Sequence, residues 1–307
     1  MFARSRKAQE LAGEVTDAAI QGRSLMRDAR ERFLRNRAAI VCMAVLGAIV
    51  AFVLFGPLLA VWSNEEIDWN AMGDATLGAP SLASGHYFGT DDLGRDLYAR
   101  TIQATRISLL VGLIGAAMAL VVGTTWGVVA GYVGGRVDAV MMRLVDILMA
   151  IPTVLVIILI LVVAGRSFIA LFLALGAVSW LTMARIVRAQ TLALKNREFV
   201  EAARAAGVSE TMIVLRHILP NLLGVVIVYA SLLVPEMILA ESFVSFLGLG
   251  ISEPLTSLGR LIAEGAGTMA YGTLWQLAFP LFFYVAIIMT MFFIGDGLRD
   301  ALDPRDR

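Results

Sequence analysis

The sequence Glu201-Ala-Ala-Arg-Ala-Ala-Gly207, which continues to Ile218-Leu-Pro-Asn221, is a polar island between two long apolar runs. Ala, Glu and Arg favour helix, and Gly often ends a helix in the left-handed conformation. Pro is tolerated in the first turn of a helix. The pattern therefore predicts a short helix over residues 198–206, a turn at Gly207 and a membrane helix that begins at Pro220.

Long apolar runs recur along the whole chain. Hydrophobic residues are 59% of its 307 residues, whereas a soluble domain has about 45–50%. About 20 apolar residues cross a bilayer. The predicted spans are residues 38–62, 107–131, 139–164, 168–186, 220–240 and 273–294. We therefore expect an all-α membrane protein with six transmembrane helices.

The second and third of these runs carry residues that affect helix packing. Small residues let membrane helices approach closely, and the second run has glycines at short intervals: Gly112, Gly115, Gly123, Gly127 and Gly131. This span is therefore expected to lie centrally in the bundle. Pro152 falls inside the third run, which we predict as one span.

Basic residues predict the orientation. Residues 1–37 carry nine Lys or Arg, and an apolar stripe among arginines favours an interfacial helix over residues 24–36, with disorder before it. The alternative is a disordered basic tail throughout. With six spans, 20 of the 25 Lys and Arg lie on the side of the termini. The positive-inside rule predicts cytoplasmic N- and C-termini and an external segment at 63–105.

The external segment contains His86-Tyr-Phe-Gly-Thr-Asp-Asp-Leu-Gly-Arg-Asp96. Its acidic residues fit neither an EF-hand loop nor a zinc site, so we expect no metal. Thr90 or Asp91 suits an N-cap, with a helix that runs from Asp92 into the second span. The residues given a structural or gating role are Asp91, Gly94, Arg95 and Asp96.

Glu236 follows Pro235 inside the fifth predicted span. An ionisable residue at membrane depth is a candidate functional residue. Glu236 either faces a watery translocation path or lies at the outer interface beside an Arg, and the sequence leaves both open.

Motifs of catalysis are absent from the sequence. It has no GxxxxGK[ST] phosphate loop and no GxSxG, HExxH or CxxC site. We expect a chain that is not an enzyme, binds no cofactor and takes its energy from a partner.

Two motifs resemble those of ABC importer permeases. The polar island resembles their EAA loop at Glu201, Ala202, Ala203, Gly207, Leu219 and Pro220, while His217 stands where the family has an apolar residue. The string at 86–96 resembles the signature of peptide and nickel importer permeases, although Ala99 replaces the usual Ser. Residues 134–146, 241–250 and 297–304 are similar to the same subfamily. Residues 22–25 and 36–39 resemble the C subunit of oligopeptide permeases.

The resemblance implies a type I ABC importer permease (MetI-like) bundle in a bacterial inner membrane. It implies a homologous second permease subunit, two cytoplasmic ATPase subunits that hold ATP and Mg, an extracytoplasmic substrate-binding protein and contact with membrane lipid, but no nucleic acid. The EAA loop would dock into an ATPase, with Ala202 and Ala203 as small surfaces and Glu201 as its acid. Oligopeptides are the expected substrate, with dipeptide, glutathione or nickel import as alternatives within the family.

The expected organisation begins with a cytoplasmic extension at 1–37 and a first transmembrane helix at 38–62. The external segment at 63–105, a permease core of five transmembrane helices at 106–295 and a cytoplasmic tail at 296–307 follow. An ion-coupled secondary transporter would need charges at mid-membrane, and an intramembrane enzyme would need paired catalytic residues within its spans. Such charges are scarce in this sequence, and no such pair is evident.

Overall fold

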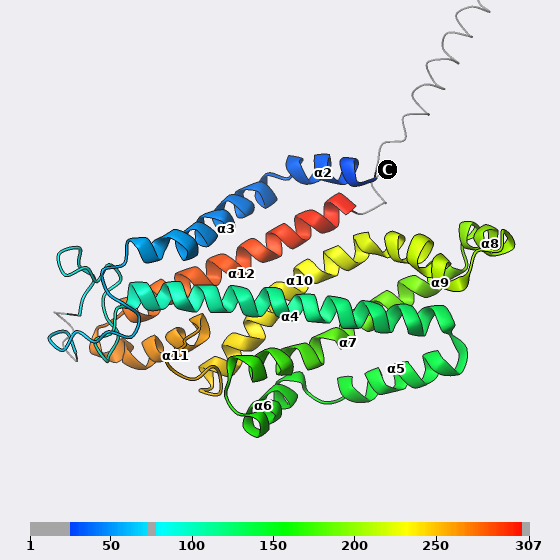
Figure 1. Ribbon diagram of the computed structural model, residues 1–307. Helices are drawn as coiled ribbons and strands as arrows, with labels where there is room; N and C mark the ends of the chain where they lie inside the picture. The colour runs from blue at the N-terminus through cyan, green and yellow to red at the C-terminus, as the bar shows by residue number, and fades with distance from the viewer. Residues whose placement is uncertain (1–24, 73–77, 303–307) are drawn as a thin grey trace, which may run out of the picture.

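The structure, a computed structural model, describes residues 25–72 and 78–302. The predicted disorder at the start of the chain and the last residues of the predicted tail lie outside this part. The described residues form a bundle of long helices, with the short helix α8 at one end and α11 at the other (Figure 1). The β-structure of the described residues consists only of isolated β-bridges.

The helices have the following bounds: α2 Leu25–Arg35, α3 Arg37–Phe55, α4 Leu97–Val133, α5 Gly135–Met149, α6 Thr153–Ala164, α7 Phe168–Lys195, α8 Glu198–Ala205, α9 Glu210–Ile213, α10 Leu219–Phe246, α11 Leu258–Thr268 and α12 Trp275–Leu302. Five stretches are long and apolar enough to cross a membrane, and the pair α5 and α6 makes a sixth if it counts as one bent span. The all-α membrane fold is therefore confirmed.

The third predicted span is not one continuous helix. α5 ends at Met149, α6 begins at Thr153, and the two are bent by 82°. Pro152 lies at the break with ψ of 121°. Proline has no N–H, and its ring disfavours helical geometry in the residue before it. The prediction of a single helix over 139–164 was therefore wrong.

Other helix ends also differ from the predicted spans. α3 gives way at Phe55 to the 3-10 turn Gly56–Leu58, which contains Pro57, so the helix stops short of residue 62. α4 begins at Leu97, well before the apolar run, and α12 continues to Leu302. Hydropathy marks the apolar length of a helix, and polar residues extend the helix on either side of it.

The central position predicted for the second span is confirmed in α4, which packs against both α7 and α10. A Cβ added to Gly127 would lie 2.5 Å from the carbonyl oxygen of Ala184 on α7. A Cβ on Gly112 would lie 2.8 Å from the side chain of Ile238 on α10. The glycines thus allow two helices to approach α4 closely.

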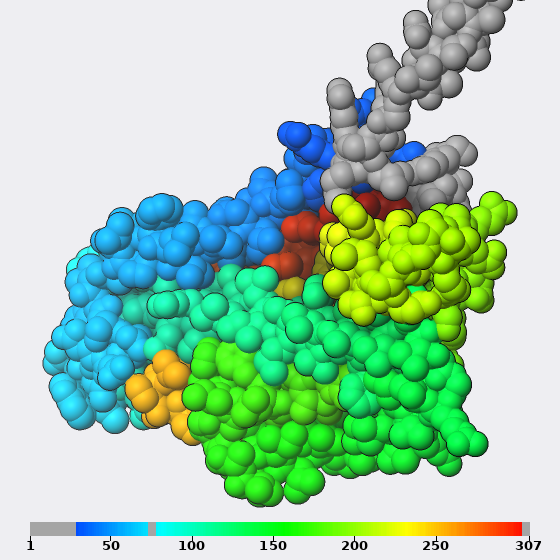
Figure 2. Space-filling model, turned by 45° about the vertical axis from the view of Figure 1, so that its right-hand side comes forward, coloured from blue at the N-terminus to red at the C-terminus, as the bar shows by residue number. Residues whose placement is uncertain are grey.

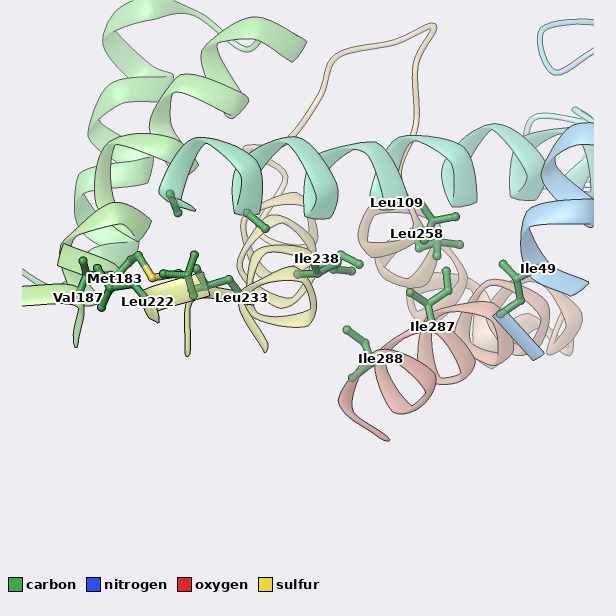
Figure 3. Close-up of a cluster of buried hydrophobic side chains, with 14 of the residues drawn as sticks. Ile49, Leu109, Met183, Val187, Leu222, Leu233, Ile238, Leu258, Ile287 and Ile288 are labelled. Atoms are coloured by element: carbon green, nitrogen blue, oxygen red, sulfur yellow. The ribbon is translucent and has the colours of Figure 1, made fainter. Parts of the chain in front are cut away.

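A cluster of buried apolar side chains joins the long helices (Figure 3). It includes Ile49 of α3, Leu109 of α4, Met183 of α7, Ile238 of α10 and Ile287 of α12. Because the cluster draws on each of these helices, they form one packed body.

Both described ends of the chain lie at the end of the bundle that carries α8 (Figure 1). The helix predicted for residues 24–36 is present as α2, which packs on α12, and its place at the membrane surface stays a prediction. A Cβ on Gly297 would lie 2.7 Å from Ala39 and 3.3 Å from the Phe33 ring. In Figure 2 the yellow-green surface of α8 and its neighbours projects at this end.

Candidate functional site

The helix predicted in the polar island is confirmed as α8, and its two faces differ. Val200 is fully buried, and Ala203, three residues later, is half-buried against the core. The exposed face is formed by residues at helical spacing: Glu198, Glu201, Ala202 and Ala205. Ala202 therefore presents a small outward surface as expected, whereas Ala203 faces the bundle.

The turn predicted at Gly207 is also confirmed. Gly207 has a φ of +79°, in the left-handed region. Its N–H donates to the carbonyl of Arg204 at 3.0 Å, and the N–H of Val208 donates to that of Ala203 at 3.1 Å. These two bonds are the Schellman pattern, which favours Gly because a Cβ is strained there. A Cβ at this position would meet open space, so the requirement for Gly lies in the backbone.

The membrane helix begins before Pro220. α9 continues through the π-helical segment Val214–Ile218 into α10, so the whole stretch from Glu210 to Phe246 is helical. Pro220 lies in the first turn of α10, next to the half-buried Leu219. The π-helical segment holds His217, whose ring centroid lies 6.5 Å from that of Phe199 on α8. Single-turn π-helical segments inside helices often occur at functional sites.

Asp91 is the centre of the predicted structural cluster at the other end of the bundle. It is buried, and its carboxylate accepts the backbone N–H groups of Leu93 at 3.0 Å and Arg95 at 2.8 Å. The guanidinium of Arg95 donates to it at 2.7 Å, and that of Arg100 donates to the same oxygen. Asp91 therefore acts as an ion-pairing acceptor for both guanidinium groups, while the structural or gating role expected from the sequence stays a prediction.

Asp96, rather than Thr90 or Asp91, caps the second span. Its Oδ2 accepts the N–H of Ala99 at 2.8 Å, and α4 begins at Leu97. The predicted helix from Asp92 is wrong because residues 91–95 form a tight turn. Gly94, with φ of +76°, belongs to this turn, and a Cβ there would lie 2.5 Å from the carbonyl oxygen of Asp68.

His86 completes the environment of Asp96. Its Nδ1 lies 2.9 Å from Asp96 Oδ1, and its ring stacks on Trp62 with centroids 4.7 Å apart. Burial raises the pKa of the Asp96 carboxyl, while the bonds from the Ala99 N–H and His86 oppose that shift.

The ion pairs extend from Asp91 to α11. Arg95 reaches Glu253 at 3.1 Å, and Arg260 of α11 binds Glu253 at 3.0 Å and Glu264 at 2.8 Å. Arg100 closes the network with Glu264 at 3.2 Å. The hydrogen bond from Arg95 lowers the pKa of Glu253. We call this set the outer ion network, after the external position predicted for residues 63–105: Asp91, Arg95, Arg100, Glu253, Arg260 and Glu264. It joins the start of α4 to α11.

Glu236 lies on α10 with its side chain exposed, between buried neighbours. No ion pair to Glu236 is present among the described residues, so an Arg of this part of the chain does not hold it. The position suits a surface that meets water or another subunit, and its role in translocation stays a prediction.

Glu241 is a buried carboxyl that the sequence reasoning did not single out. It is fully buried on α10, and its partners are hydroxyls: Ser245 at 2.5 Å, Ser242 at 3.3 Å and Ser108 of α4 at 3.5 Å. Ser108 in turn accepts the N–H of Leu258, the first residue of α11. Hydroxyl residues one and four positions after Glu241 were the available signal.

We expect Glu241→Leu to destabilise the assembled protein, because the hydroxyls would lose a buried acceptor at a cost of about 1–3 kcal/mol for each group left unsatisfied. Glu241→Gln retains an acceptor oxygen and is expected to cost less. Thermal unfolding of the purified protein in detergent measures both. If both variants unfold at the same temperature as the wild type, the three serine hydroxyls around Glu241, which we call its hydroxyl cage, do not stabilise the fold.

Two family models match the sequence. Residues 123–307 match the binding-protein-dependent transport system inner membrane component, and residues 24–84 match the N-terminal TM domain of oligopeptide transport permease C. The chain is 48% identical to the oligopeptide transport system permease protein OppC of Haemophilus influenzae, over 97% of this chain and 94% of that protein. It is 51% identical to OppC of Escherichia coli K12, over 94% of each.

A solved structure supports the same fold. The methionine ABC transporter MetNI in an inward-facing conformation has a chain that superposes with a TM-score of 0.54 at 18% identity. The match covers 66% of this chain and 96% of that one. At this identity the likeness concerns the fold alone.

Proposed function

The chain belongs to the family of binding-protein-dependent transport system inner membrane components, and on this premise we propose that it is a permease subunit of an ABC importer that moves oligopeptides across the bacterial inner membrane. It is a transport subunit rather than an enzyme. Its similarity to oligopeptide permeases over nearly its whole length supports the substrate class.

The exposed face of α8 is the observation that carries this proposal. α8 lies between α7 and the helix that leads into α10, and buried Val200 holds it on the bundle. Its outward face offers two acidic residues and the small Ala202 and Ala205. A partner protein bound to this face can displace the ends of α7 and α10 together. We assign this face to docking with a cytoplasmic ATPase that binds ATP and Mg.

Transport then follows from alternating access, in which ligands shift the balance between two conformations. Closure of the two ATPases on ATP displaces α8, and α7 and α10 carry the displacement through the membrane. At the far end, the outer ion network and the hydroxyl cage of Glu241 tie α11 to α4. We place this end at the outer face, where a substrate-binding protein delivers the peptide.

The translocation path is assigned to the surface shared with the second permease. Glu236 is exposed on α10 and has no ion-pair partner in the described part of this chain. A carboxylate at this depth would suit the ammonium group of a peptide.

Reconstitution tests the function. Proteoliposomes that hold this chain, the second permease and both ATPases are expected to take up a labelled short peptide only when the binding protein and ATP are present. Uptake driven by an ion gradient without ATP would overturn the proposal in favour of a secondary transporter.

Cysteine labelling tests the orientation. In a Cys42→Ala background, Leu82→Cys should react with an impermeant maleimide in intact cells, because Leu82 is 86% exposed and is placed outside. Ser209→Cys, exposed beside α8, should react only after the cells are opened. Labelling in the opposite order would contradict the cytoplasmic assignment of the termini and α8.

A further inference from the structure

Tyr132, near the end of α4, contacts α9, which follows the turn at Gly207. Its ring is buried, and its hydroxyl donates to Oε2 of Glu210, the first residue of α9. Tyr132 and Glu210 are far apart in the sequence, so this contact joins the central helix α4 directly to the base of the α9–α10 helix.

Glu210 also binds α8. Arg204 Nε donates to Glu210 Oε1 at 3.0 Å, and another guanidinium nitrogen donates to Oε2 at 3.3 Å. This is a bidentate pair, in which the planar guanidinium fixes orientation as well as distance. Arg204 and Glu210 flank the turn at Gly207, so the pair holds the end of α8 against the start of α9.

Lys195 adds the end of α7 to the same cluster. Its Nζ donates to the backbone carbonyl of Tyr132 at 2.5 Å and lies 5.5 Å from the centre of the Tyr132 ring. Tyr132, Lys195, Arg204 and Glu210 together line a recess of about 530 Å³. The cluster therefore ties four helices together: α4, α7, α8 and α9.

We propose that Tyr132, Arg204 and Glu210 form a brace that transmits the displacement of α8 to α4, in addition to the covalent connections to α7 and α10. The inference rests on the proposed function of α8 as the ATPase-docking helix. Apart from the brace, α8 is joined by the chain to α7 and α9 and is packed on the bundle by Val200, whereas α4 is the helix whose glycines pack against α7 and α10. These three residues are positioning residues, since they act through α8 and not on the peptide; the side chains of Arg204 and Glu210 are themselves 43% and 59% exposed.

The brace predicts uncoupling rather than simple loss of assembly. Coupling free energies between sites typically correspond to roughly 5- to 150-fold effects, so we expect Arg204→Glu and Glu210→Arg each to lower peptide uptake per ATP hydrolysed about tenfold. The double variant restores opposite charges at the same two positions and is expected to regain most of this ratio. Tyr132→Phe, which removes only the hydroxyl, should give a smaller fall in the same ratio.

The experiment uses the complete reconstituted transporter and measures peptide uptake and ATP hydrolysis in the same vesicles. Arg197→Gln is the matched control: it removes a positive charge beside α8 that has no hydrogen bond or ion pair within the described residues, and its ratio should equal that of the wild type. Co-purification of the ATPases with each variant shows whether docking survives.

The outcomes separate this inference from the function it rests on. A wild-type complex that shows no ATP-dependent peptide uptake would overturn the proposed function. A working wild type, with single variants that keep its ratio, would overturn the brace alone. The brace is also overturned if the double variant does not exceed the single variants in peptide uptake per ATP hydrolysed. Where the single variants do not assemble with the ATPases, it is overturned if the double variant assembles no better than they do.

Discussion

Asp91→Ala is expected to destabilise the outer end of the transporter more than any other single change in this segment. The substitution leaves the buried guanidinium of Arg100 without its closest carboxylate and frees two backbone N–H groups of the turn. Removal of one partner from a buried ion pair costs about 3–5 kcal/mol. We expect a clear fall in thermal stability of the purified complex and faster proteolysis within residues 86–96.

Two further variants define the cause. Glu65→Ala removes an exposed carboxylate from the same outer segment and should melt like the wild type. Asp91→Asn keeps an acceptor for the turn but loses the charge that faces Arg95 and Arg100, so an intermediate effect is expected. If Asp91→Ala melts like Glu65→Ala, the outer ion network does not hold this end together. Metal analysis of the same samples is a separate check, because one tightly held ion that Asp91→Ala removes would contradict the ion-pairing role.

Local patterns in the sequence predicted local structure well. The apolar runs gave the long helices, the glycine intervals gave the central helix, and the polar island gave α8 with its turn at Gly207. Each of these depends on residues within a few helical turns of one another. Helix propensity, small-residue spacing and the left-handed preference of Gly act at that range.

Long-range pairs could not be predicted in the same way. Arg95 donates a hydrogen bond to Glu253, and Ser108 donates one to Glu241; in each pair the two residues are more than a hundred positions apart in the sequence. No local spacing indicates such partners. The brace has the same character, since Tyr132 and Glu210 belong to different helices and neither stands out in the sequence.

The cap of α4 and the break at Pro152 were predicted wrongly. In both places the local sequence allows several structures, and tertiary contacts determine which one forms. Thr90, Asp91 and Asp96 are all suitable caps, and the turn at Gly94 made Asp96 the one that meets the helix. Pro152 permits either a kinked helix or a complete break, and the packing of α6 beside α7 accompanies the break.

Gly207→Val is expected to abolish most peptide uptake while the chain still inserts. At a φ of +79° a residue with a Cβ pays roughly 1–2 kcal/mol, and a β-branched residue more. The strain acts on the two hydrogen bonds that close α8, so the exposed face of α8 loses its fixed direction. Gly207→Asn should retain more uptake, since Asn tolerates the left-handed region better.

The control for this variant is Gly47→Val on α3. Gly47 also has open space at its Cβ position, but its backbone is helical, so the same side chain is added without left-handed strain. Uptake by this variant should match the wild type.

Ala202→Trp tests the docking face without changing the turn. It adds bulk to the exposed side of α8, and we expect it to prevent ATPase binding as well as uptake, whereas Gly207→Val should leave some ATPase bound. Uptake and ATPase co-purification in the reconstituted complex distinguish the two effects. Normal uptake by both variants would mean that α8 does not transmit the motion of the ATPases, because one variant alters its direction and the other its contact surface.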